Sequence, residues 1–262
     1  MNDVPRLLSR LKNKLKKRSP WIILIAFLTP FVLTAHILLT LPDVTTLRAG
    51  TPDETAFMRY RREEARKKGL DYEPRSEWVD FDRVPELLKE SIRITEDASF
   101  YWHKGIDFEE LKESIKKDLR EKRPVRGGST ITQQLAKNLF LSPRKNPLRK
   151  VREIFIARRL EKALSKERIF ALYLNLIELG PGIFGVQAAS RHYFGSDVSS
   201  LFLEEIVRLT AIIPRPLTTD PLGPGQWLNW RCRYILGKLR LYKKIGEDDY
   251  SRLMAVFTLD DK

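Results

Sequence analysis

Two adjacent acids, Glu96 and Asp97, are followed by three aromatic residues and His103 in the segment EDASFYWH. A carboxylate beside apolar rings loses hydration, which raises its pKa toward the range that a general acid or base needs near neutral pH. The same pattern also suits an ordinary helix end, where an acid is solvated or paired. His103 is more typical of a structural histidine than of a metal ligand, because the chain holds only three histidines. Glu96 is a candidate acid or base whose role its own segment does not decide.

A second polar segment, GGSTITQQLAKN at residues 127–138, begins with two glycines and continues with a helical pattern. Ser129 or Thr130 is placed to cap that helix. A helix N-terminus exposes unpaired amides and a partial positive charge, so it suits an anion such as phosphate. Lys137 lies two turns further along and can reach the same side. The segment is not a Walker loop, because the spacing G-x-x-x-x-G-K-[ST] is absent.

A third candidate, Glu153, lies in RKVREIFIARRLEK, where Arg149 and Lys150 precede it by four and three residues. The simplest interpretation is an ion pair along one helix flank, which contributes a few tenths of a kcal/mol. Two separated carboxylates near cationic groups would instead suit sugar transfer at an anomeric carbon with a phosphate leaving group. One carboxylate would remove a hydroxyl proton, and the cations would stabilise the departing charge.

The elements that must position these residues are predicted to be helices. Apolar residues recur at helical spacing in five segments, 84–92, 108–119, 148–157, 169–177 and 203–209. The last of these stops at Pro214 and Pro216, and a helix, a turn and a second helix follow. No alternating strand pattern of useful length and no internal repeat is found. We therefore predict a mainly α domain over residues 77–262, preceded at residues 42–76 by a connector with one short helix.

The N-terminal part indicates a membrane anchor. Residues 21–41 form a stretch of 21 residues without a formal charge, which matches the length that crosses a bilayer. A cleaved signal peptide and a buried core helix are the alternatives, but the run exceeds the usual signal core of about 7–15 residues and lacks an A-x-A site. Residues 1–20 hold seven basic side chains and one acidic one. This asymmetry predicts a basic cytoplasmic tail, one transmembrane helix, and a domain outside the cytoplasm.

Composition and charge narrow the class of protein. The formal charge is +14, and the N-terminal tail carries about +6 of it. The remaining excess suits nucleic acid, anionic lipid or a phosphate-bearing substrate. Cys232 is the single cysteine, so no internal disulfide can form. The cysteine count therefore neither requires nor excludes an oxidising compartment.

Five ordered motifs together resemble the family 51 glycosyltransferases, the glycan polymerases of cell-wall synthesis. They are EDxxFxxHxG at 96–105, GGSTITQQLAKN at 127–138, RKxxExxxAxxLE at 149–161, KERIxxxYLNxIELGxGxxGxxAAxxxYFG at 166–195, and the later IIPRP. The segment IELGPGIFGVQAASRHYFG is most similar to the monofunctional, membrane-anchored branch of that family.

The resemblance implies a helical, lysozyme-like fold with two lobes and an inverting reaction that joins lipid II units through β-1,4 links. It makes Glu96 the general base on the acceptor sugar hydroxyl and Glu153 a second essential acid near the donor pyrophosphate. A divalent cation, Mg²⁺ or Mn²⁺, is a candidate cofactor there, with its ligands unknown, and no organic cofactor is expected. Lys137 would help to neutralise the pyrophosphate. The other implied residues are Ser129, Gln134 and Asn138 in the donor groove, and Asp97, Phe100 and His103, which shape the first motif.

Two positions depart from the family pattern. The family usually has an arginine eight residues after the motif lysine, whereas this chain has Lys145 there, with Arg144 just before it. Lysine keeps the charge but loses bidentate phosphate binding, so either side chain is a candidate for the role. In IIPRP, Arg215 stands where the family commonly has asparagine.

Other functions fit the sequence less well. A bifunctional penicillin-binding protein needs a transpeptidase domain, for which about 65 residues after the motif at 166–195 leave no room. A lytic glycosidase would use a similar fold and a catalytic glutamate, and a membrane-tethered basic scaffold would need no catalysis. The expected partners are lipid II, the growing glycan strand and the inner membrane, with cell-wall synthesis proteins as further candidates and no nucleic acid. Glycan length and oligomeric state are not accessible from the sequence.

Overall fold

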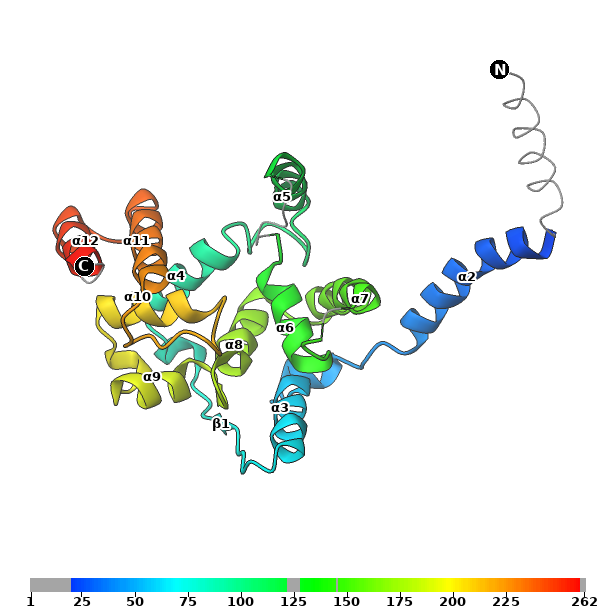
Figure 1. Cartoon of the computed structure of the whole chain (residues 1–262), viewed down its shortest axis with the longest axis horizontal. Helices are drawn as coiled ribbons and strands as arrows, with labels where there is room; N and C mark the ends of the chain where they lie inside the picture. Colours follow the sequence, from blue (N-terminus) through cyan, green and yellow to red (C-terminus); the bar gives the residue numbers. More distant parts are fainter. Residues whose placement is uncertain (1–19, 122–127, 145, 260–262) are drawn as a thin grey trace, which may run out of the picture. The chain divides into compact units, whose positions relative to one another are not determined.

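The protein is described by a computed structural model that covers residues 20–121, 128–144 and 146–259 (Figure 1). It divides into two compact units, Met1–Pro42 and Asp43–Lys262. The first unit contains the helix α2 (Pro20–Leu39). Within the described part of the chain, no helix was found that is both long and apolar enough to cross a membrane. The predicted span at 21–41 includes residues whose side chains are not described. The basic tail up to residue 19 lies outside the described residues. The anchor therefore stays a prediction.

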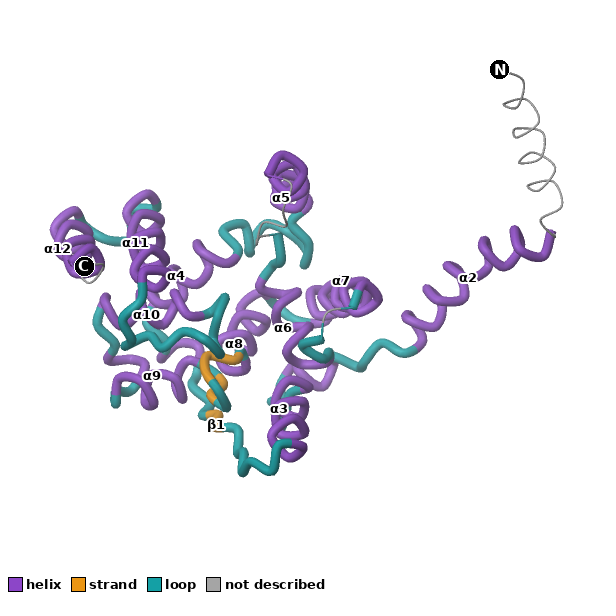
Figure 2. Tube along the Cα trace, viewed as in Figure 1, coloured by secondary structure: helices purple, strands orange, loops and turns teal. Residues whose placement is uncertain are grey.

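The second unit is built mainly from helices, which confirms the predicted mainly α class (Figure 2). Its longer helices follow one another as α3 (Ala56–Lys67), α4 (Glu86–Glu96), α5 (Phe108–Glu121), α6 (Ile131–Phe140), α7 (Pro147–Ala163), α8 (Lys166–Leu176), α9 (Val186–Phe194), α10 (Leu203–Ile212), α11 (Gln226–Leu241) and α12 (Glu247–Leu259). Within the described residues, three short 3₁₀ turns accompany them: η1 (Thr45–Arg48) before α3, η2 (Phe81–Arg83) between α3 and α4, and η3 (Val198–Ser200) between α9 and α10.

A small sheet joins the start of the unit to its centre. The strands β1 (Arg75–Ser76), β2 (Glu178–Gly180) and β3 (Ile183–Phe184) are ordered β1-β3-β2, with β1 parallel and β2 antiparallel to β3. Gly185 follows β3 with a φ of +83°, and a Cβ there would lie 2.4 Å from the Asn175 carbonyl oxygen. Only glycine fits both the backbone conformation and this close approach, which explains one glycine of the long fourth motif.

The helices that carry the predicted site residues are held by different neighbours. The helix α6 packs against α3, α7 and α8, and its Ile131 and Leu135 are fully buried. The helix α4 packs against α10 and α11, and α11 also contacts α12. Residues 43–76, expected as a connector, lie in this second unit, where α3 contacts α6. Tertiary packing therefore brings together α6 and the end of α4, although the two helices pack against different neighbours.

Candidate active site

Glu96 is the last residue of α4, and its carboxylate lies against side chains from two other helices. Gln134 Nε2 of α6 donates to one carboxylate oxygen at 3.1 Å, and a terminal guanidinium nitrogen of Arg231 in α11 donates to the other at 2.9 Å. Only 11% of the Glu96 side chain is exposed. Burial raises the pKa of Glu96 above its ordinary value, although Arg231, Gln134 and Lys137 act in the opposite direction. The carboxylate is thus desolvated and held in place, as a general base requires.

Tyr173 of α8 sets the orientation of Gln134. The Tyr173 hydroxyl donates to Gln134 Oε1 at 3.1 Å, which leaves the Gln134 amide nitrogen to face Glu96. Tyr173 is fully buried, and this burial raises the pKa of its hydroxyl well above the ordinary value, so the group stays a donor. A buried hydrogen-bonded chain therefore runs from Tyr173 through Gln134 to Glu96 and Arg231.

Asp97 binds the first motif to α6. Its carboxylate accepts the backbone N–H of Ile131 at 2.9 Å and a hydrogen bond from His103 Nε2 at 2.9 Å. Phe100 is fully buried. These three predicted residues, Asp97, Phe100 and His103, are therefore packed inside the fold, where they position Glu96 and the first turn of α6.

The N-terminus of α6 was expected to suit an anion. Thr130 caps the helix, because its hydroxyl accepts the backbone N–H of Gln133 at 3.2 Å. The first helical amide is bonded to the Asp97 carboxylate, so the protein supplies its own anion at this position. Ser129, the other predicted cap, instead accepts a hydrogen bond from Lys150 Nζ of α7 at 3.0 Å. Two amides of this first turn are therefore already bonded within the protein, and the phosphate site there stays a prediction.

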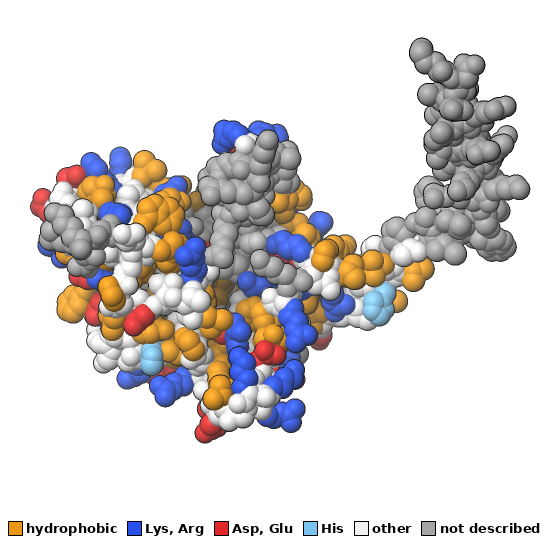
Figure 3. All heavy atoms as spheres, viewed as in Figure 1, with side chains coloured by type: hydrophobic (Ala, Val, Ile, Leu, Met, Phe, Trp, Pro, Cys, Tyr) orange, Lys and Arg blue, Asp and Glu red, His pale blue; other side chains and the backbone are white. Residues whose placement is uncertain are grey.

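A pocket of about 410 Å³ lies beside the Glu96 network. Its walls come from α3, α6, α7, the start of β2 and the loop after α10. Among its lining residues are two predicted donor-groove residues, Gln134 and Asn138, the predicted pyrophosphate-binding Lys137, and Arg149. The face drawn in Figure 3 shows Lys and Arg side chains gathered over α3, which supplies Arg61 to the pocket wall. This pocket has the cationic lining that a phosphate-bearing ligand needs.

Lys137 is a largely desolvated cation of this pocket. Burial lowers its pKa below the ordinary lysine value. The nearby Glu153 carboxylate acts in the opposite direction, and the charges of Arg149 and Lys150 add to the lowering. Among the described residues, no carboxylate forms an ion pair with Lys137, whose ammonium group lies 5.6 Å from the Phe57 ring centroid. A desolvated cation that is not in direct contact with a carboxylate is a strong binding group for an anionic ligand.

The second cation predicted from the motif is not placed in the pocket. Arg144 lies against α3, where its guanidinium contacts the Tyr60 hydroxyl at 3.5 Å and Glu64 at 3.8 Å. Its side chain is 69% exposed. Lys145 lies outside the described residues.

Comparison with known proteins establishes the family. The profile of the Transglycosylase family matches residues 63–240, a range that contains Glu96, Lys137, Glu153 and Arg231. The chain belongs to this family. Biosynthetic peptidoglycan transglycosylases are its curated relatives: that of Nitrosospira multiformis is 44% identical over 72% of this chain and 82% of its own length. That of Herminiimonas arsenicoxydans is 36% identical over 86% and 96%. The resemblance to family 51 glycosyltransferases is thereby confirmed.

A solved structure is similar as well. Penicillin-binding protein 1A from Haemophilus influenzae aligns with 70% of this chain and 18% of its own, at 20% identity and a TM-score of 0.41.

The transglycosylase residues around Glu153 do not fit a resident divalent cation. Across the described ranges, no three His, Cys, Asp or Glu side chains gather as metal ligands would. Glu153 is 3% exposed and already accepts hydrogen bonds from Arg149, at 2.8 Å, and from Lys150. Mg²⁺ and Mn²⁺ need several oxygen ligands, whereas cations surround this carboxylate. A divalent cation therefore stays a prediction, for which these residues supply no ligand set.

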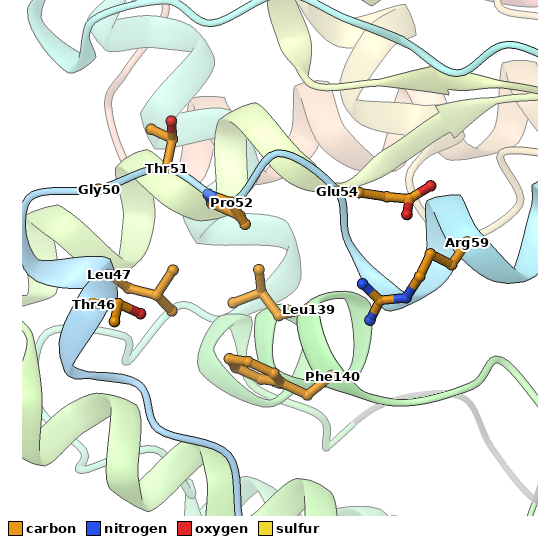
Figure 4. Close-up of a pocket in the computed structure, with 9 residues that line it drawn as sticks. All are labelled: Thr46, Leu47, Gly50, Thr51, Pro52, Glu54, Arg59, Leu139 and Phe140. Atoms are coloured by element: carbon orange, nitrogen blue, oxygen red, sulfur yellow. The ribbon is translucent and has the colours of Figure 1, made fainter.

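A second pocket of the transglycosylase, of about 270 Å³, lies between residues 46–59 and the end of α6 (Figure 4). Figure 4 shows the side chains of Leu47, Pro52, Leu139 and Phe140 in its wall. None of the predicted site residues lines it. The donor residues of α6 therefore face the larger pocket.

Arg231 is the site residue that the sequence did not single out. It lies 135 residues after Glu96 in the chain, and its side chain is only 13% exposed where it pairs with that carboxylate. The segment WRCRYILGK around it has the appearance of an ordinary basic helix. No local signal marks Arg231, because its role depends on the packing of α11 against α4.

Replacing Glu153 with glutamine is expected to destabilise the transglycosylase by about 2 kcal/mol. The change leaves Arg149 and Lys150 close together without their carboxylate. The expected loss of stability is smaller than the ~3–5 kcal/mol of a fully buried pair, because Lys150 is 42% exposed. Chemical denaturation of the full chain in detergent measures the difference. Glu113→Gln, in the exposed Glu113–Lys116 pair of α5, is the matched control and should change stability by less than about 0.5 kcal/mol. Equal stability of the two variants would contradict the structural role of Glu153.

Proposed function

We propose that the protein is a biosynthetic peptidoglycan transglycosylase that polymerises lipid II into β-1,4-linked glycan strands. One observation carries the proposal most: the buried Glu96 carboxylate lies beside a cationic pocket that contains Lys137. Family membership and the named relatives support the same activity. The substrates are lipid II and the growing glycan strand.

The geometry suggests how the transfer proceeds. Glu96 takes the proton of the acceptor sugar hydroxyl as its oxygen forms a bond to the donor anomeric carbon. The bond between that carbon and the pyrophosphate oxygen breaks with its electron pair on the leaving group, and the configuration inverts. Lys137 stabilises the charge that grows on the pyrophosphate. The proton on Glu96 then passes to solvent, which restores the base.

Glu153 has a different place in this mechanism. Its carboxylate holds Arg149, which lines the pocket, and Lys150, which also donates to Ser129. Glu153 therefore orients the cationic wall near the donor pyrophosphate, and Ser129 is joined to that wall through Lys150.

Incubation of the detergent-solubilised full chain with lipid II tests the proposal. We expect glycan polymer and released lipid pyrophosphate, with little effect on preformed glycan. A lytic glycosidase would instead shorten preformed glycan, because its catalytic glutamate would serve hydrolysis. A basic scaffold protein would do neither. Either of these two results would overturn the proposed function.

We also propose that residues 21–41 anchor the enzyme in the inner membrane, with residues 1–20 in the cytoplasm, 42–76 as the following segment, and the domain at 77–262 facing the periplasm or the outside of the cell. The uncharged stretch and the basic residues before it support this topology. It brings the pocket to the compartment where lipid-linked substrate, and other cell-wall synthesis proteins as candidate partners, would meet it.

Alkaline extraction and protease protection test the anchor. The full chain should stay in the membrane pellet, and protease added outside spheroplasts should digest the domain but spare the tail. Phe31→Asp, a charge near the centre of the stretch, should weaken retention because a central acid costs roughly 3 kcal/mol in a span. Glu109→Asp, a change at an exposed residue of the domain, serves as the control. Release of the wild-type chain by alkali would refute the anchor.

A further inference from the structure

Arg215 lies on the loop after α10, and this loop is restrained. Pro214 and Pro216 flank it, and both fix the backbone φ angle. The Arg215 N–H donates to the Ile212 carbonyl at 2.9 Å, and the Thr218 N–H donates to the Arg215 carbonyl at 3.2 Å. The loop lines the 410 Å³ pocket from residue 213 to residue 218. Arg215 is therefore presented to the pocket by a backbone of limited freedom.

The Arg215 side chain is also held in place without being neutralised. Its guanidinium lies over the Trp227 ring, 4.3 Å from the centroid. Within the described residues, no carboxylate forms an ion pair with it. Stacking on an aromatic face leaves the N–H edge of the guanidinium free to bind a ligand. Arg215 is thus an exposed, pre-oriented cation that forms no ion pair within the described residues.

Two other arginines of the pocket already have carboxylate partners. Arg61 donates two hydrogen bonds to Glu178, at 2.7 and 2.8 Å. Arg149 donates to Glu153 at 2.8 Å. A bound anion would have to compete with these carboxylates for both guanidinium groups.

Lys137 and Arg215 are therefore the pocket cations, within the described residues, that form no direct ion pair with a carboxylate, although the charge of nearby Glu153 does act on Lys137. A pyrophosphate presents several oxygens with more than one negative charge, which one ammonium group neutralises only in part. A guanidinium adds two parallel N–H donors to phosphate oxygens. Arg144, the arginine nearest the usual motif position, is instead held against α3.

We propose that Arg215 binds the pyrophosphate of the lipid-linked donor together with Lys137, in the role that the sequence divided between Arg144 and Lys145. This inference rests on the proposed function and names the group that the same pocket recognises. Arg215 forms and breaks no covalent bond. Its N–H donors bind the pyrophosphate more strongly as the anomeric C–O bond breaks and charge collects on the leaving oxygen.

Binding of inorganic pyrophosphate to the full chain in detergent, measured by titration calorimetry, tests this role. Arg215→Asn, which installs the residue common in the family, is expected to weaken binding by about 10-fold or more, the loss that one charge-assisted contact predicts. Arg215→Lys keeps the charge without the fork and should weaken binding by about 3-fold. Arg252→Asn, at an exposed arginine of α12 paired with Asp249, is the matched control and should bind as the wild type does.

The remaining outcomes separate this proposal from its rivals. Unchanged pyrophosphate binding in Arg215→Asn, even with slower lipid II turnover, would overturn it and point to another part of the substrate, such as a stem-peptide carboxylate. A larger loss in Arg144→Asn than in Arg215→Asn would assign the role to Arg144. No binding by the wild type would also overturn it. Polymerisation of lipid II by the wild type, measured in parallel, reports on the proposed function independently of these results.

Discussion

Glu96→Gln is expected to slow lipid II polymerisation by about 10²- to 10⁴-fold, the usual contribution of a positioned general base. Glutamine has nearly the same shape, and its carbonyl oxygen can still accept one of the hydrogen bonds from Gln134 and Arg231. It cannot take a proton from the acceptor hydroxyl. The rate of polymer formation at saturating lipid II measures the effect, and the melting temperature shows whether the variant is folded.

Glu90→Gln is the matched control for this experiment. Glu90 lies on the same helix and pairs with Arg93 at 2.8 Å, but it is not bonded to Gln134 or Arg231. Its loss should lower stability and leave the turnover of the folded enzyme within a few-fold of the wild type. If Glu96→Gln polymerised at the wild-type rate while remaining folded, the base mechanism would be excluded.

The pH profile of the wild type gives a further test of the same base. Glu96 must be ionised to act, and its pKa lies above the ordinary 4.5, so activity should fall, as the pH decreases, at a higher pH than an ordinary carboxyl would give. Lys137 must be protonated to bind phosphate, and its pKa lies below the ordinary 10.5, so activity of the free enzyme should fall early as the pH rises. We expect a bell-shaped pH profile of kcat/KM whose two limbs lie closer together than the ordinary pKa values of a glutamate and a lysine would place them.

Lys137→Met is expected to lower kcat/KM for lipid II by about 10²- to 10³-fold, because it removes a pre-oriented charge from the leaving group. The unbranched methionine keeps the apolar contact with Phe57. Because the burial cost is the largest effect on this cation, removing it should leave the folded state equally or more stable. Steady-state kinetics and thermal unfolding of the same preparation measure both quantities.

Lys89→Met is the control for that substitution. Lys89 also lies over an aromatic ring, 4.4 Å from the Phe81 centroid, but it pairs with Glu86 outside the pocket. Its turnover should stay close to that of the wild type. A Lys137→Met variant that is active but unstable would contradict the role of Lys137 in leaving-group stabilisation and favour a structural one.

Local sequence patterns predicted where the helices lie better than they predicted which helix faces are buried. The apolar spacing over residues 108–119 indicated a helix, and α5 is present, yet Phe108 and Leu111 are exposed. Periodicity reports which residues share a face of a helix, but whether that face is covered depends on elements elsewhere in the chain. The same limit applies to the first turn of α6. The sequence indicated that its backbone N–H groups could bind an anion, but it did not show that the Asp97 carboxylate accepts one of them.

By itself, the sequence determined the mainly α class, the family, and Glu96, Lys137 and Glu153 as the residues to consider, because ordered motifs and helical spacing are local properties of the chain. Tertiary structure alone decided that Arg231 and Gln134 hold the Glu96 carboxylate, and that Asp97 and His103 face inward. It also placed Arg215, which lies 78 residues after Lys137, in the wall of the same pocket. The physical reason is common to these cases: desolvation and charge pairing depend on which side chains meet in space, and these partners come from different helices and loops.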